Sequence, residues 1–247
     1  MVRIVDHSNR KKKVLAATVI AHIRNGEPVS SQELANDFGL SSATIRSILA
    51  ELEEEGYLSH PHTSAGKVPS SQGYRYYVDF LMEESALSEE EKNTIIRQYY
   101  RNTSKSLDDI LEATSDLVAE ITHYATIVSS SQWQDKIFLR GLSNIIRQPE
   151  FKDVERLASV LRLLEEKRKL MEIINKELER PLKVYIGEEM GCPEISDSCS
   201  LVISTYSIGK KDKGRIAVLG PSRMSYEQTF SNLGFISATL THLLEDF

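Results

Sequence analysis

The pattern of hydrophobic and polar residues over the first forty positions predicts two helices joined by a tight turn. Apolar side chains recur every three to four positions across residues 10–24, and a glycine and a proline end that stretch. Ser30 or Ser31 then opens a second, shorter helix that Gly39 closes. A further helix after this turn would complete a helix-turn-helix arrangement.

The segment that follows has the clearest helical pattern of the chain. It opens at Ser41 or Ser42, and its apolar residues fall at i, i+3, i+4 and i+7 on one face: Ile45, Ile48, Leu49 and Leu52. The opposite face is small and polar near the start, whereas glutamates fill the later turns. Small side chains let a helix approach base edges and glutamates repel phosphates, so the N-terminal half of this helix is the expected reading surface for DNA.

We expect the DNA contacts of this helix from five residues: Ser42, Ala43, Thr44, Arg46 and Ser47. Ser and Thr can donate or accept a hydrogen bond, Ala can touch a thymine methyl group, and Arg can bind a guanine or a phosphate. The competing interpretation is a solvated helix in a protein-interaction module.

Residues 57–69 have the pattern of a short strand, a loop and a returning strand, which indicates a β wing. We expect wing contacts to phosphate or the minor groove from His62, Thr63, Ser64 and Lys67. His60 and His62 stand at alternate positions, which also permits a metal site, but they have no nearby cysteine or carboxylate support. We therefore expect neither a metal nor a cofactor.

The aromatic stretch 74–82 is too dense for a free linker, and we expect it to pack beneath the wing. Within it Arg75 has two interpretations. It either contacts a DNA phosphate, as in our expected set of DNA-binding residues, or pairs with Asp79 four positions later.

The rest of the chain predicts an α+β body. A long amphipathic helix opens at Ser106 and carries an apolar stripe over 107–121, which needs a partner either on its own body or on a second subunit. A further helix is expected over 154–178. Short apolar runs then predict strands at 182–186, 200–206 and 214–219, and a closing helix follows from Tyr226.

Composition and charge narrow the functional class. The 247 residues carry a net charge of −6, yet the first 50 carry +3 and the remainder −9. A mildly basic N-terminal module on an acidic body suits a specific DNA-binding regulator. No apolar run is long enough to span a membrane and no secretion signal opens the chain, so we expect a cytoplasmic protein. The two cysteines, Cys192 and Cys199, are expected to be reduced thiols.

An enzyme requires a constellation of reactive residues, and the sequence has none with diagnostic spacing. It lacks a glycine-rich phosphate loop, a GxSxG motif and an HExxH motif. We therefore expect no catalytic residues.

At this point the run ATIRSILAELEEEGYLSHPHTSAGKVPSSQGYRYYVDFLM, residues 43–82, resembles the winged-helix module of the HrcA-type heat-inducible transcription repressors. Four later blocks are similar to that family in the same order: FLRGLSN at 138–144, QPEF at 148–151, VYIGEE at 184–189 and LGPSRMSY at 219–226. Together these stretches cover most of residues 10–247.

The resemblance implies an N-terminal winged helix-turn-helix domain over 1–82, a helical linker over 83–124 and a GAF-like regulatory and dimerisation domain over 125–247. It implies a homodimeric repressor of heat-shock (chaperone) genes that binds an inverted-repeat operator in double-stranded DNA, with its active state maintained by the GroE chaperonin. The chain departs from the family pattern between 121 and 138, where members usually have a much longer stretch, so the GAF-like domain is expected to be reduced.

Two other functions remain open from the residues. One is a ligand-responsive or metal-responsive winged-helix repressor, in which polar loops of the body line a pocket. The other is a winged-helix module that binds protein rather than DNA.

Overall fold

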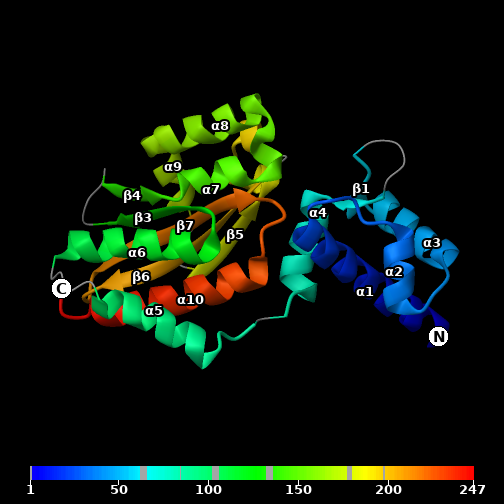
Figure 1. Cartoon of the computed structure of the whole chain (residues 1–247), viewed down its shortest axis with the longest axis horizontal. Coiled ribbons are helices and arrows are strands. Elements are labelled where there is room, and N and C mark those ends of the chain that lie inside the picture. The colour runs from blue at the N-terminus through cyan, green and yellow to red at the C-terminus, as the bar shows by residue number, and fades with distance from the viewer. Residues whose placement is uncertain are drawn as a thin grey trace. The chain divides into compact units, whose positions relative to one another are not determined.

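The computed structural model describes residues 2–61, 66–83, 85–101, 106–131, 136–176, 180–196 and 198–247 (Figure 1). The chain divides into two compact units. The first holds residues 1–83 with 222–225, and the second holds residues 84–221 with 226–247. Each unit has its own hydrophobic core and is described by itself.

The first unit is a winged helix-turn-helix. Its elements are α1 (Val2–Asn25), α2 (Ser31–Phe38), α3 (Ser42–Glu54), β1 (Leu58–Ser59), β2 (Val68–Pro69), α4 (Ser71–Tyr76) and a π-helical segment, η1 (Tyr77–Leu81). The predicted helices and the wing are therefore confirmed. The difference lies at the start, because α1 begins at Val2 rather than near residue 10.

Local capping explains why these helices begin and end where the sequence indicates. The Ser30 hydroxyl accepts the Glu33 N–H at 3.2 Å at the start of α2, and Gly39 closes that helix with a φ of 59°. The apolar stripe of α3 is buried against α1 and α2, with Ile45 fully buried. Burying one such side chain contributes about 1.5–3 kcal/mol, so the stripe fixes which face of α3 remains outside.

The wing is anchored to the helices at two points. Val29, just before α2, exchanges two backbone hydrogen bonds with Lys67 at 2.8 and 2.9 Å, which form an isolated antiparallel bridge next to the start of β2. Gly73 in α4 lies against the carbonyl of Tyr57, and a Cβ at that glycine would meet this oxygen at 2.1 Å. The aromatic stretch also packs here as expected, since Tyr74 and Tyr77 are buried.

The second unit is a mixed helix and sheet body, which confirms the α+β fold class. Its strands are β3 (Ala125–Ser130), β4 (Ile137–Arg140), β5 (Leu182–Ile186), β6 (Cys199–Ile208) and β7 (Asp212–Pro221). They form one antiparallel sheet in the order β4-β3-β7-β6-β5. Its helices are α5 (Glu89–Arg101), α6 (Leu107–Thr122), α7 (Leu142–Arg147), α8 (Val154–Glu165), α9 (Lys167–Ile174) and α10 (Tyr226–Leu243), with short 3-10 turns η2 (Pro149–Lys152), η3 (Gly187–Met190) and η4 (Pro193–Ile195).

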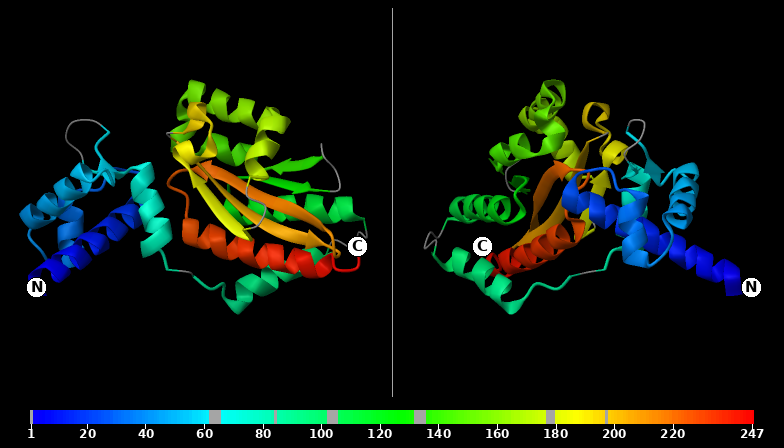
Figure 2. Two further views of the ribbon diagram at one scale, coloured as in Figure 1. Left: turned by 180° about the vertical axis from the view of Figure 1, so that it is seen from behind. Right: turned by 45° about the vertical axis from the view of Figure 1, so that its right-hand side comes forward.

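Helices cover both faces of this sheet (Figure 2). α7, α8 and α9 enclose one core with the alternate strand residues that include Ile127, Ala217 and Leu219. α6 and α10 pack on the other face, against β3 and β6 respectively, and α5 lies on these two helices. The stretch 83–124, expected as a helical linker, thus supplies α5 and α6 to the second unit.

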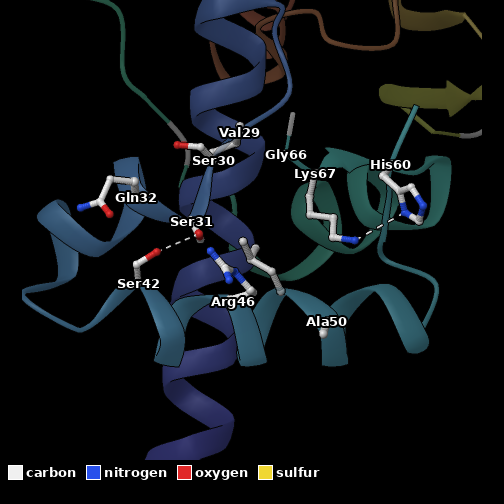
Figure 3. A pocket seen from close by; sticks show the side chains of 11 residues that line it. Val29, Ser30, Ser31, Gln32, Ser42, Arg46, Ala50, His60, Gly66 and Lys67 are labelled. Carbon is white, nitrogen blue, oxygen red and sulfur yellow. Dashed lines mark hydrogen bonds between the residues drawn. The ribbon is translucent and has the colours of Figure 1, made fainter. Parts of the chain in front are cut away.

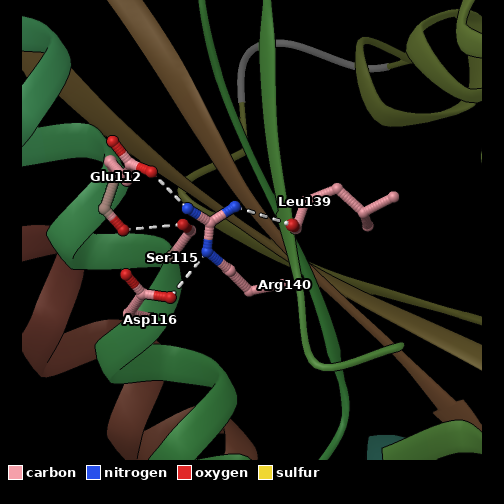
Figure 4. Close-up of polar contacts among 5 residues, drawn as sticks. All are labelled: Glu112, Ser115, Asp116, Leu139 and Arg140. Atoms are coloured by element: carbon pink, nitrogen blue, oxygen red, sulfur yellow. Dashed lines mark hydrogen bonds and ion pairs between the residues drawn. The ribbon is translucent and has the colours of Figure 1, made fainter. Parts of the chain in front are cut away.

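The apolar stripe of α6 finds its partner within the same chain. Leu111, Leu117 and Val118 are at most 4% exposed because they face the sheet and α10. On the outer side, Arg140 of β4 donates to Asp116 at 2.6 Å and also binds Glu112, which ties α6 to the sheet edge (Figure 4). Of the two alternatives for this stripe, the structure shows packing on its own body.

Two sequence-based expectations for the body also need correction. The single helix over 154–178 is broken at Glu166, whose φ of −77° and ψ of 67° are not helical, and α8 and α9 result. The break turns the buried face of α9, so Ile173 and Ile174 lie inside while Met171 is half-buried; Leu178 lies outside the described residues. The strands β3 and β4 and the helix α7 were not predicted.

Candidate nucleic-acid interface

The start of α3 is held by hydroxyl groups. Ser41 caps the helix, because its Oγ accepts the N–H of Thr44 at 3.1 Å and also lies 2.8 Å from the Thr44 hydroxyl. The hydroxyls of Ser42 and Ser31 lie 3.0 Å apart, which fixes the first turn of α3 to the first turn of α2. Ser42 is half-buried by this contact and presents its side chain to the angle between the two helices.

The outward face of α3 has the composition expected for reading DNA. Ala43, Thr44, Arg46 and Ser47 are all exposed, and Ala50 continues this row toward the C-terminal half. Within the described part of the chain Arg46 makes no ion pair, so its guanidinium is available to a phosphate or to a base edge. The structure brings these residues together on one exposed surface.

A groove of about 580 Å³ runs between α3, the start of α2 and the wing (Figure 3). Arg46 rises into it from α3, and Lys67 and His60 reach it from the wing. The remaining lining residues are Val29, Ser30, Ser31, Gln32, Ser42, Leu49, Ala50 and Gly66. Hydroxyl, amide and cationic groups therefore surround one concave surface beside the reading face.

Sequence reasoning missed the share of α2 in this surface. Ser31 and Gln32 lie in the first turn of α2, where backbone N–H groups and the positive end of the helix dipole favour an anion. The signal was present, because a serine pair at a helix start next to a glutamine is both a cap and a phosphate-binding composition.

The glutamates of α3 are less repulsive than their number suggests, because cations lie beside them. Glu53 binds the Lys67 ammonium and the His60 ring, Lys11 of α1 donates to Glu55 at 2.5 Å, and His7 lies 3.6 Å from Glu51. Hydrogen bonds from Lys67 and His60 lower the pKa of Glu53, and the bond to Glu55 raises the pKa of Lys11. Glu54 stays exposed, which still limits close approach at this end of α3.

The remaining residues expected to bind DNA fall into three cases. His62, Thr63 and Ser64 lie outside the described residues. Arg75 is half-buried and donates to Asp79 at 3.2 Å, which is the ion-pair alternative of the sequence analysis. Lys67 lies at the groove but is shared with Glu53.

Other kinds of site find little support in the described part of the chain. It holds no group of three or more His, Cys, Asp and Glu side chains that could bind a metal ion. Both cysteines are buried free thiols. In the same residues no helix is long and apolar enough to cross a membrane.

Comparison with known families agrees with both units. Residues 16–61 match the model of the IclR helix-turn-helix domain, and residues 130–230 match that of the HrcA protein C terminal domain. A solved structure described as a hypothetical protein at 2.2 Å resolution superimposes with a TM-score of 0.76 at 17% identity, covering 96% of this chain and 97% of the other. This likeness concerns the fold alone.

Whole-chain relatives give the family. The heat-inducible transcription repressor HrcA of Desulforudis audaxviator is 30% identical, over 96% of this chain and 97% of its own length. That of Carboxydothermus hydrogenoformans is 31% identical, over 95% and 97%. The two alignments extend over 337 and 335 positions, more than the 247 residues of this chain, so these relatives contain residues with no counterpart here.

These relatives are transcription regulators rather than enzymes, and residues 16–61 of this chain match a helix-turn-helix domain. The chain belongs to the HrcA family of heat-inducible transcription repressors and is a DNA-binding regulator.

Proposed function

We propose that this chain represses heat-shock (chaperone) genes by binding an inverted-repeat operator as a homodimer. The observation that carries the proposal is the exposed row Ala43, Thr44, Arg46 and Ser47 on α3, with an arginine that has no ion-pair partner among the described residues. Such a row reads base edges in the major groove, while the wing and α2 hold the phosphates. Residues 1–82 would act as the DNA-binding domain and residues 125–247 as the regulatory and dimerisation domain, in a cytoplasmic protein.

A gel-shift titration on an inverted-repeat operator and on random duplex of equal length tests the DNA-binding role. Replacing Arg46 with Ala should weaken operator binding by about 1–3 kcal/mol and random-duplex binding by less, because a base contact is lost. Arg97→Ala is the matched control, since Arg97 is an exposed arginine on α5 of the other unit. Equal losses on both duplexes would make Arg46 a phosphate contact, and no operator preference in the parent chain would contradict the proposal.

The homodimer is tested by the operator itself. Two recognition helices related by a twofold axis require half-sites spaced by about one helical turn or a multiple of it. Inserting five base pairs between the half-sites should therefore abolish tight binding, whereas inserting ten should restore part of it. Sedimentation that shows only monomer, both with and without operator, would overturn the dimer.

Chaperonin dependence follows from the family resemblance. We expect the fraction of chain that binds operator to rise when denatured protein is refolded with GroE and ATP, compared with refolding in buffer alone. If both preparations bind operator to the same extent, this shortened chain folds without the chaperonin and that part of the proposal fails.

A further inference from the structure

Arg215 on β7 is a buried cation without a buried anion. Its side chain is 3% exposed, and it lies on the sheet face that also carries Ala217 and Leu219 beneath α7, α8 and α9. No carboxylate pairs with it in the described residues. Taking an ionised group out of water costs several kcal/mol unless hydrogen bonds and an opposite charge compensate for it. Burial accordingly lowers the pKa of Arg215.

The two guanidinium nitrogens of Arg215 that lack a hydrogen-bond acceptor lie along one edge of the group. Nη1 donates to the Thr205 hydroxyl on the neighbouring strand β6, whereas Nε and Nη2 are buried and have no hydrogen-bond acceptor. Nε and Nη2 point their N–H bonds in parallel from the same side of the planar group. Two parallel donors at this spacing match the two oxygens of one carboxylate.

A second donor projects from the same face of the neighbouring strand. Ser129 of β3 is the register partner of Arg215, so the two side chains project from the same face of neighbouring strands. Ser129 is 2% exposed, and among the described residues its hydroxyl has no hydrogen-bond partner. A hydroxyl and a bidentate arginine together can satisfy a bound carboxylate and offer little to a neutral molecule.

The end of the strands next to Arg215 offers an approach from solvent. Lys213, two residues before Arg215 on the same face, is exposed, and Thr205 is half-buried. Arg215 and its register partners on the neighbouring strands are therefore close to the solvent-exposed end of the sheet.

We propose that Arg215 and Ser129 form a binding site for the carboxylate of a small molecule in the second unit. Arg215 binds the two carboxylate oxygens through Nε and Nη2, Thr205 orients the guanidinium through Nη1, and Ser129 donates a further hydrogen bond. The site is separate from the DNA-binding surface of the first unit, so it does not depend on the proposed operator function.

Thermal unfolding of the full chain in formate, acetate and pyruvate, each against chloride at equal ionic strength, tests the site. A ligand that binds only the folded state raises the unfolding temperature with its concentration. We expect a saturable rise in unfolding temperature with the carboxylates and a smaller rise with inorganic phosphate, whose tetrahedral oxygens match the guanidinium edge less well. A larger rise with phosphate would overturn the assignment to a carboxylate. No rise with any anion beyond that in chloride would overturn the site itself.

Variants separate the site from general salt effects. Arg215→Lys keeps the charge but lacks the two parallel N–H groups, so it should lose the carboxylate response, as should Arg215→Met. Without carboxylate, Arg215→Met should unfold at the same temperature as the parent chain or above it, because an uncompensated buried charge is removed. Arg168→Met is the matched control, since Arg168 is 95% exposed on α9 and its loss should leave the response intact. A response that persists in both Arg215 variants would also overturn the proposal.

Discussion

The carboxylate of Glu53 on α3 binds the ammonium of Lys67 on the wing, and the ring of His60 binds the same carboxylate. This contact joins the two elements that surround the groove of Figure 3. It also keeps one wing cation occupied within the protein. In the proposed DNA complex, the affinity of this surface for phosphate would therefore depend on a glutamate as well as on its cations.

Replacing Glu53 with Gln should strengthen DNA binding. The change removes a negative charge next to the phosphates and releases Lys67 to bind them, so operator and random duplex should both bind several-fold more tightly at low salt. The slope of log affinity against log salt should steepen by about 1. Fluorescence anisotropy at several salt concentrations measures both quantities. Lys67→Met is the opposite control, because it leaves Glu53 unpaired and should weaken both complexes.

The same contact predicts a pH dependence of folding stability. The pKa of Glu53 lies below its ordinary value of 4.5 because Lys67 and His60 donate hydrogen bonds to it. The stabilisation is therefore complete above that ordinary value and is lost as the pH falls through the lower, folded-state pKa. Since the pair is partly exposed, it should contribute less than about 1 kcal/mol. The difference in unfolding free energy in urea between the parent chain and Glu53→Gln should therefore shrink as the pH falls from 7 through the folded-state pKa; a constant difference would contradict the prediction.

Gly73 and Gly234 offer a matched pair of glycine-to-alanine changes. At Gly73 a Cβ would meet the Tyr57 carbonyl oxygen at 2.1 Å, so Gly73→Ala must displace the base of the wing and should cost about 1–3 kcal/mol. At Gly234 in α10 nothing lies within 4 Å of the added carbon, and Ala should stabilise the helix by about 0.5–1 kcal/mol. Denaturant unfolding gives both values. Similar effects of the two changes would show that α4 yields easily at its contact with Tyr57.

The helix-turn-helix segment could be predicted because residues close together in the sequence specify where its helices begin, end and pack. Ser41 caps α3 through an atom three residues away, Gly39 closes α2, and the stripe that includes Ile45 falls at helical spacing. Each of these features depends on neighbours within a few residues, and the structure reproduces them. The exposed face of α3 followed directly, since burying the stripe leaves only one side for contacts outside the protein.

The sequence-based predictions failed where contacts between distant segments determine the local structure. The strand β4 has four half-buried residues and gains its partner only by pairing with β3, so the sequence carries little periodic signal there. The break at Glu166 lies within an otherwise helical pattern and places Leu170 and Ile174 in the core. Lys67 was expected to face phosphate, and its contact with Glu53 requires the wing to fold back on α3.

Leu111→Ala tests the assignment of the α6 stripe to the body of one chain. Leu111 is fully buried between α6 and the rest of the second unit, so removing its side chain should cost about 2–5 kcal/mol of unfolding free energy. If instead the stripe formed a subunit interface, the variant would keep its stability as a monomer and lose mass in sedimentation equilibrium. We expect the reverse, with lower stability and unchanged association of the chains that remain folded. Glu120→Ala on the exposed side of α6 is the control and should change neither measurement.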